Sequence, residues 1–222
     1  ITRLAAAGRL DANQLTYAGP SRPLEELYDS ESDPHQVRNL ASSPEHEAVL
    51  ERMRGLHEKW ELETLDLGFL PEADAWERCA GSTPWKMARD AGRYPLKDIL
   101  RAASLVGRKD ALERQVELLA DADAGVRFWA AVGLSAAGKD AASAEEKLAR
   151  CLEDASQSVR IEAAGALAAL GGAERALPVL VRELGGAQLD CALHAARALQ
   201  LLGEKARPAL PSLKAALEAA SR

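Results

Sequence analysis

Two stretches of the sequence share one pattern, Asp121-Ala-Asp-Ala-Gly-Val-Arg-Phe-Trp-Ala-Ala-Val-Gly-Leu134 and Asp154-Ala-Ser-Gln-Ser-Val-Arg-Ile-Glu-Ala-Ala-Gly-Ala-Leu167. In both, an aspartate precedes Val-Arg, an Ala-Ala pair and a leucine follow, and a glycine comes four residues later, at Gly138 and Gly171. The two copies are offset by 33 residues throughout. The valine, the alanine pair and the leucine fall on one side of an α-helix, and glycine suits the helix end. A fixed offset of this length is typical of stacked structural repeats.

A third copy follows 32 residues later, with Ala195-Ala196, Leu199 and Gly203, and with Cys191-Ala192 in place of Val-Arg. A degraded earlier copy is expected within residues 94–106. The segments between the copies also carry apolar residues at helical spacing, so each unit is expected to be two antiparallel helices. Neither helix can bury its apolar stripe alone, and stacking of neighbouring units solves this. The pattern therefore predicts a mainly α protein, with an α-α superhelix of about three and a half helix pairs over residues 95–222.

These residues resemble HEAT repeats, and more closely the HEAT-like class of phycobilisome lyases, whose signature is an aspartate-rich turn followed by Val-Arg-x-x-Ala-Ala-x-x-Leu. The resemblance implies a polar ladder between repeats, for which the matching turn aspartates and helix arginines are Asp121 with Arg127 and Asp154 with Arg160. Solenoids usually bind along a concave surface built from one helix of each pair. By chain order, we expect that surface to include Arg114, Glu117, Glu145, Arg182 and Glu183.

The first part of the chain has different chemistry. Short extended segments are expected at residues 14–18 and 26–28, around a Gly-Pro-Ser-Arg-Pro turn. Asp33-Pro34 predicts a short helix to residue 40, and Ser43-Pro44 a longer one to about residue 64. Such a small set of elements cannot form an independent core. We therefore expect residues 1–66 to be an incomplete α+β part of a larger domain, followed by a linker over residues 67–94.

A second resemblance lies in this part. The stretches Arg22-Pro-Leu-Glu-Glu-Leu-Tyr-Asp29 and Asp33-Pro-His-Gln-Val-Arg-Asn-Leu-Ala41 resemble the C-terminal subdomain of bacterial sulfatases of the arylsulfatase and N-sulfoglucosamine sulfohydrolase type. One departure is Gln36, where an acidic residue is common. The resemblance implies a parent sulfatase, periplasmic or secreted, with a calcium ion and a formylglycine made within a C/S-x-P-S-R motif.

That catalytic machinery has no counterpart at the positions of this sequence. Ala18-Gly-Pro-Ser-Arg22 contains Pro-Ser-Arg, but alanine stands at the nucleophile position. The three cysteines lie far apart and form no C-x-x-C pair, which disfavours a metal site and a disulfide framework. We expect no catalytic, cofactor-binding or metal-binding residue in this segment; the catalytic part of a parent sulfatase would lie outside this sequence.

The charge of the chain limits its partners. The formal net charge is −6 and no dense Lys/Arg cluster occurs, which disfavours nucleic acid and also sulfated glycans. No run of 18 apolar residues is present, so no membrane span is expected. Trp76, Trp85 and Tyr94 flank the expected linker, where aromatic residues anchor a linker more often than they stack on a sugar. A protein partner, or docking onto a hydrolase domain of the same protein, is the expectation.

Three functions remain open on these grounds. The favoured one is a non-catalytic C-terminal part of a sulfatase-like hydrolase, in which the solenoid is a scaffold for protein interaction or docking. The alternative is a HEAT-repeat adaptor without hydrolase activity. An enzyme acting through this segment itself ranks last.

Overall fold

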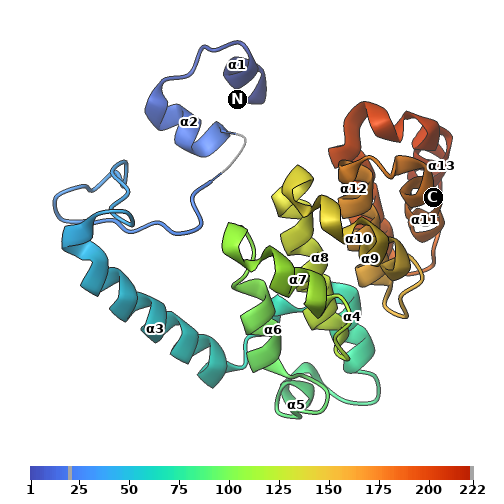
Figure 1. Cartoon of the computed structure of the whole chain (residues 1–222), viewed down its shortest axis with the longest axis horizontal. Helices are drawn as coiled ribbons and strands as arrows, with labels where there is room; N and C mark the ends of the chain where they lie inside the picture. The colour runs from blue at the N-terminus through green and yellow to red at the C-terminus, as the bar shows by residue number, and fades with distance from the viewer. Residues whose placement is uncertain (20–21, 221–222) are drawn as a thin grey trace. The chain divides into compact units, whose positions relative to one another are not determined.

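The computed structural model describes residues 1–19 and 22–220, and this part of the chain is mainly α-helical, with no β-strand (Figure 1). The expected fold class is thereby confirmed at the level of a mainly α protein. The chain divides into two compact units, Ile1–Glu63 and Thr64–Arg222. Each unit is described by itself.

The first unit contains α1 (Thr2–Ala6), α2 (Ala12–Ala18), the 3-10 turn η1 (Pro44–His46) and the long helix α3 (Glu47–Thr64). Its hydrophobic core is small and consists of Leu27, Leu40 and Leu50. One α3 residue, Leu50, therefore packs against two residues of the irregular segment that precedes η1.

Asn39 holds that irregular segment together. Its side-chain oxygen accepts hydrogen bonds from the backbone N–H groups of Leu27 (3.0 Å) and Ala41 (2.9 Å), and its amide donates to the carbonyl of Glu25 (3.0 Å). The backbone of Leu40 also donates to the carbonyl of Leu27 (2.7 Å). These bonds satisfy buried backbone groups without a sheet.

Two local expectations for this unit are wrong. Residues 14–18 form the end of α2, because Asp11 caps the helix and Gln14 completes a capping box, whereas residues 26–28 are irregular. No helix forms over residues 34–40. There the Asp33 carboxylate accepts the N–H of Arg38 (2.8 Å) and Gln36 adopts a left-handed φ of 51°, which interrupts a right-handed helix. The described residues of this unit therefore contain none of the strands expected for an α+β segment.

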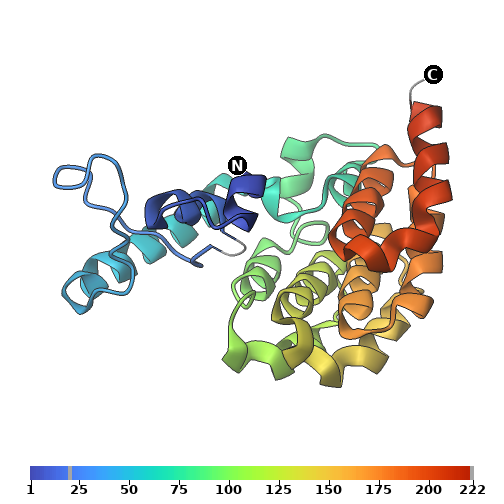
Figure 2. The same ribbon diagram turned by 90° about the horizontal axis from the view of Figure 1, so that it is seen from above.

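The second unit is a stack of helices with its own core. Its elements are η2 (Leu67–Phe69), α4 (Glu72–Arg78), α5 (Pro84–Ala88), α6 (Leu96–Ala103), η3 (Lys109–Ala111), α7 (Leu112–Leu118), α8 (Ala124–Ala137), η4 (Gly138–Ala144), α9 (Glu145–Cys151), α10 (Gln157–Leu170), α11 (Ala173–Leu184), α12 (Leu189–Leu202), η5 (Gly203–Ala209) and α13 (Leu210–Ala220). In Figure 2 these helices follow one another side by side from α6 in green to α13 in red.

Helices α6, α8, α10 and α12 form one row in which each helix packs against the next, and α7, α9 and α11 lie between them in the chain, with α13 after α12. The alanine pairs of the repeated pattern lie at these contacts: Ala130, Ala131, Ala163, Ala164 and Ala195 are all 0% exposed. Small side chains let neighbouring helix backbones approach closely, and the helices then bury one another's apolar stripes.

The glycine that closes each repeated helix is required by the backbone. Gly138, Gly171 and Gly203 all have positive φ, at 56°, 117° and 55°. A side chain with a Cβ is disfavoured in that region. The left-handed cap expected from the sequence is formed fully at Gly171, whereas the other two combine positive φ with a ψ near −127° and lead directly into η4 and η5.

Residues 67–94 are packed into this unit and do not form a free linker. Met87 and Tyr94 are buried, at 1% and 2% exposure, and Trp129 of α8 donates from its indole nitrogen to the carbonyl of Phe69 (2.8 Å). Asp74 of α4 is 5% exposed and accepts hydrogen bonds from the hydroxyls of Ser156 (3.2 Å) and Ser158 (2.9 Å). The segment therefore packs against α8 and α10 of the row.

The buried Asp74 carboxylate provides a test of this packing. Asp74→Ala should lower the free energy of unfolding by about 1–3 kcal/mol, because two buried serine hydroxyls lose their acceptor. Asp98→Ala is the matched control, since this carboxylate is 60% exposed on α6 and pairs with Arg101 on the surface. Urea denaturation of the two variants should separate them, and equal stabilities would contradict the docking of α4.

Candidate functional site

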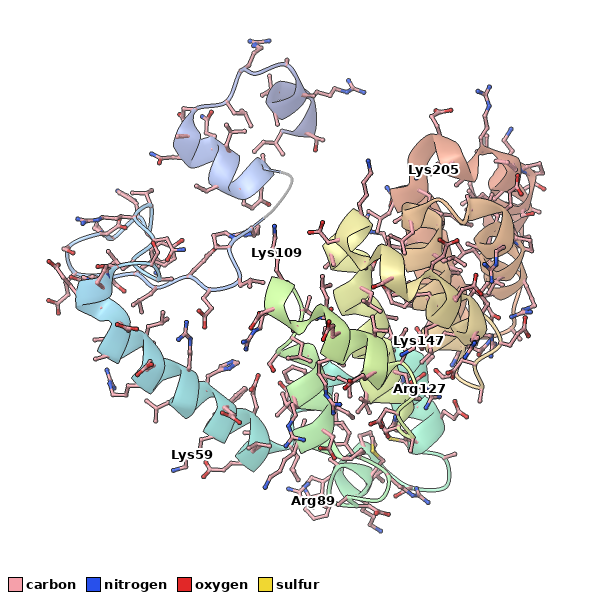
Figure 3. All side chains as sticks on the ribbon, viewed as in Figure 1. Lys59, Arg89, Lys109, Arg127, Lys147 and Lys205 are labelled. Atoms are coloured by element: carbon pink, nitrogen blue, oxygen red, sulfur yellow. The ribbon has the colours of Figure 1, made fainter. Side chains whose placement is uncertain are left out.

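The arginines of the repeated pattern lie at the N-terminal ends of α8 and α10 and join successive helices. Arg127 of α8, labelled in Figure 3, binds Asp154 with two hydrogen bonds, from Nε to Oδ2 and from Nη2 to Oδ1, each 2.7 Å. Its Nη1 donates to the carbonyls of Asp121 and Ala122, both at 2.9 Å. One guanidinium thus holds the turn before its own helix and the turn before the next, in the paired geometry that makes such contacts strong.

Arg160 of α10 repeats this arrangement with a different carboxylate. Its Nη1 donates to the carbonyls of Asp154 (2.7 Å) and Ala155 (3.1 Å), and its Nε and Nη2 bind Glu183 at 2.8 and 3.1 Å. In the third copy, which is offset by 32 residues, the position of Asp154 is occupied by Gly186, so the next turn offers no aspartate. Glu183, from the end of α11, supplies the missing carboxylate.

A third arginine extends the series at the start of the unit. Arg78, the last residue of α4, binds both carboxylate oxygens of Asp123, at 2.8 and 3.1 Å, and its Nη1 also donates to the carbonyl of Arg93 (2.8 Å). Asp123 in turn caps α8 by accepting the N–H of Gly125 (2.8 Å). We name Arg78, Arg127 and Arg160, with the carboxylates they bind, the arginine ladder.

From the sequence we expected a ladder between repeats that involves Asp121, Arg127, Asp154 and Arg160. In the structure Arg127 binds Asp154 of the next copy, whereas Arg160 binds Glu183, which was not among the expected ladder residues. The Asp121 carboxylate accepts the N–H of Asp123 (2.9 Å). The position that would hold its arginine, 33 residues before Arg127, is Tyr94.

Electrostatics follow this pairing. The hydrogen bonds that Arg127 donates to Asp154 raise the pKa of this arginine, and those that Arg160 donates to Glu183 raise the pKa of Arg160, against the opposing effect of burial. Burial by itself would raise the pKa of Glu183, but the hydrogen bonds donated by Arg160, Gln157 and Arg182 outweigh it and hold this pKa below its ordinary value. Arg127, Arg160 and Glu183 are therefore charged at neutral pH.

The expected concave surface is only partly available to a partner. Arg114 and Glu117 lie on α7, are 56% and 62% exposed, and pair with each other at 2.8 Å. Glu145 is exposed in the first turn of α9, and Arg182 of α11 is 51% exposed. The expectation that Glu183 lies on this surface is wrong, because the residue is 2% exposed and faces the arginine ladder. Arg182 and Glu183 differ in exposure because of the rotation of α11 about its axis, which the order of residues along the chain does not specify.

The described residues contain no group of three or more His, Cys, Asp and Glu side chains placed to hold a metal ion. The residues present therefore do not fit the calcium ion of a sulfatase. Pro20 and Ser21 of the Pro-Ser-Arg sequence lie outside the described residues.

The free cysteines are buried. Burial, followed by the charge of Asp74, raises the pKa of Cys191 to about 11, and burial also raises the pKa of Cys151. Thiols with raised pKa values remain protonated at neutral pH and are poor nucleophiles and metal ligands.

In the described part of the chain, no helix combines the length and the apolar character needed to cross a membrane.

Removal of one ladder arginine provides a stability test. Arg160→Met should lower the free energy of unfolding by about 3–5 kcal/mol, because Glu183 is left buried without its main partner. Arg182→Met is the matched control, since it removes a contact to the same carboxylate from a side chain that is half exposed. Thermal and urea unfolding of both variants would measure the difference. Similar losses would contradict the role assigned to Arg160.

The pH dependence of stability should report Glu183 as well. Its folded pKa lies below its ordinary value of 4.5, so its stabilising effect is fully present above that value and is lost as the pH falls through the folded pKa. Glu183→Gln should therefore lose less stability than the wild type between neutral pH and pH of about 3. Urea unfolding at a series of pH values measures this, and parallel curves would show that Glu183 does not titrate as proposed.

Comparison with known proteins relates part of the chain to a sulfatase. No family model matches the sequence. A stretch of 74 residues is 35% identical to an ulvan-active sulfatase of Formosa agariphila. The stretch covers 33% of this chain and 12% of that sulfatase, so the chain spans only a small part of its relative. The similarity indicates that the chain contains a sulfatase-related segment.

Proposed function

We propose that residues 1–66 are the C-terminal subdomain of a sulfatase-like hydrolase that cleaves sulfuric esters, and that the helical stack is a HEAT-like solenoid that docks onto proteins. The observation that carries this proposal is the stretch of 74 residues that is 35% identical to an ulvan-active sulfatase. In the whole protein, the calcium ion, the formylglycine and the catalytic residues would come from a different segment, and a periplasmic or secreted location would follow.

The surface of α3 supports an attachment of the first unit to a larger domain. Val49, Met53 and Leu56 are 39%, 49% and 54% exposed and recur at helical spacing on α3. The unit's own core takes up only one residue of this helix, Leu50. An exposed apolar stripe of this kind is typical of a contact site for another domain or protein. Given the similarity to a sulfatase, we propose that a hydrolase domain covers it.

The repeated contacts of the second unit support a HEAT-like solenoid. Arg127 and Arg160 lie 33 residues apart, and each donates to backbone carbonyls of the turn before its own helix and to one carboxylate. The matching alanine pairs are buried in α8 and α10. Such a unit has one stacking interface per repeat and presents rows of equivalent surface residues. In this stack the exposed charges of α7, α9 and α11 are both acidic and basic, which fits a protein partner better than a polyanion.

A direct test begins with the coding sequence that precedes Ile1. The proposal expects a C/S-x-P-S-R motif there, and the longer product should hydrolyse 4-nitrophenyl sulfate. The 222-residue chain should show no rate above the buffer blank, and replacing the Cys or Ser of the motif by Ala should abolish the activity of the longer product. Absence of the motif would contradict the hydrolase proposal, as would hydrolysis by the 222-residue chain itself.

The docking surface has its own test. A triple variant, Arg114→Glu, Glu145→Lys and Arg182→Glu, should weaken binding to partners captured from the native cell by about tenfold, because complementary charges on the partner become repulsive. Arg197→Glu on α12 is the control, since it changes one exposed charge on the other row of helices. Quantitative mass spectrometry of the captured proteins measures the change. An unchanged set of partners would contradict the surface assignment.

A further inference from the structure

A cavity lies where α4 crosses the beginnings of α10 and α12. Its volume is about 390 Å³, and its lining consists of Ala73, Asp74, Trp76, Glu77, Gln157 and Gln188. Four of the lining residues, Ala73, Asp74, Trp76 and Glu77, come from α4, and the two glutamines lie at the starts of α10 and α12. The cavity is therefore formed by the packing of α4 onto the stack and does not exist in either part alone.

Trp76 gives this cavity an aromatic wall. The side chain is 55% exposed, in a chain in which only 4% of residues are aromatic. Its indole nitrogen donates to Glu72 Oε1 one turn earlier (2.9 Å), which fixes the orientation of the ring. The electron-rich face of an indole attracts the weakly positive C–H groups on the apolar face of a sugar ring.

Polar side chains complete the cavity around that wall. Asp74 is committed to Ser156 and Ser158, and the amide of Gln157 is committed to Glu183 (3.0 Å). Within the described residues, no hydrogen bond is formed by the side chains of Glu77 or Gln188. A carboxylate and an amide of this kind together offer acceptors and a donor for hydroxyl groups.

The charge of the lining selects among amphipathic ligands. Asp74 and Glu77 are acidic, and none of the six lining residues is Lys or Arg. The nearest arginines of α4 and its loop are engaged elsewhere, since Arg78 binds Asp123 and Arg93 pairs with Asp90. Among the charged side chains of the lining, a sulfate or carboxylate group on a ligand would meet only Asp74 and Glu77, which repel it.

We propose that this cavity binds an uncharged pyranose unit of a polysaccharide, with the apolar face of the sugar on Trp76 and its hydroxyls on Glu77 and Gln188. This role is independent of the proposed sulfatase origin and of the docking surface on α7, α9 and α11. A cationic peptide is a weaker fit. Asp74 already accepts two hydroxyl bonds and lies at the positive end of the α10 dipole, so Glu77 is the one lining carboxylate left for a cation.

The test uses the 222-residue chain and the indole N–H signals of its tryptophans in two-dimensional NMR. The probes are the methyl glycosides of glucose, galactose, xylose, mannose and rhamnose, neutral tetrasaccharides of the same sugars, a sulfated tetrasaccharide and tetralysine. At least one neutral saccharide should shift the Trp76 signal in a saturable way. Trp76→Ala, followed through the side-chain amide signals of Gln157 and Gln188, should weaken that binding about tenfold or more, and the sulfated probe should bind more weakly than its neutral counterpart.

Trp85→Ala is the matched control. Trp85 is 64% exposed on α5, but the guanidinium of Arg89, labelled in Figure 3, lies 3.8 Å from its ring centre, and it does not line the cavity. Binding should survive in this variant, whereas Gln188→Ala should weaken it. Circular dichroism and thermal unfolding confirm that each variant is folded. The proposal is overturned if no neutral saccharide shifts the Trp76 signal, if both tryptophan variants lose binding equally, or if tetralysine alone binds.

Discussion

The guanidinium of Arg127 does three things at once, and the order of the stack depends on this. It closes the turn before α8 by binding two carbonyls, and it binds the carboxylate that organises the turn before α10. Asp154 also accepts the N–H of Ser156, so the arginine fixes the start of the next helix as well. At 15% and 10% exposure, the two partners are shielded enough for the pair to be worth more than a surface contact.

Helix packing and this polar edge constrain each other. The buried alanines bring α8 and α10 close together, which places the two turns within reach of one guanidinium. The arginine then fixes their register along the helix axes, which the smooth alanine surface would leave loosely defined. Hydrophobic stacking supplies most of the stabilisation, and the arginine ladder supplies the alignment.

The segment of residues 67–94 has a similar dual role. Its helices α4 and α5 have only 7 and 5 residues, but the segment brings one arginine to Asp123 and one buried carboxylate to the start of α10. It thereby binds the beginnings of α8 and α10 with contacts of the kind that the repeats use among themselves. We expected a linker here, because the sequence does not reveal contacts between residues 45 to 84 positions apart, which lie beyond the range of any local pattern.

The sequence by itself determined the repeated helices, their boundaries at glycines, and the arginines that join them. These features arise from local periodicity and backbone conformation, and both copies of the 33-residue repeat show them. The resemblance to sulfatases was likewise recognised from residues 22–41, and the similarity of a 74-residue stretch to a known sulfatase is consistent with it.

Only the tertiary structure decided which carboxylate each arginine binds, that Glu183 is internal, and that α4 forms a cavity with the stack. These outcomes depend on helix phase and on which distant segments meet in space, and side chains one residue apart on a helix, such as Arg182 and Glu183, face different environments.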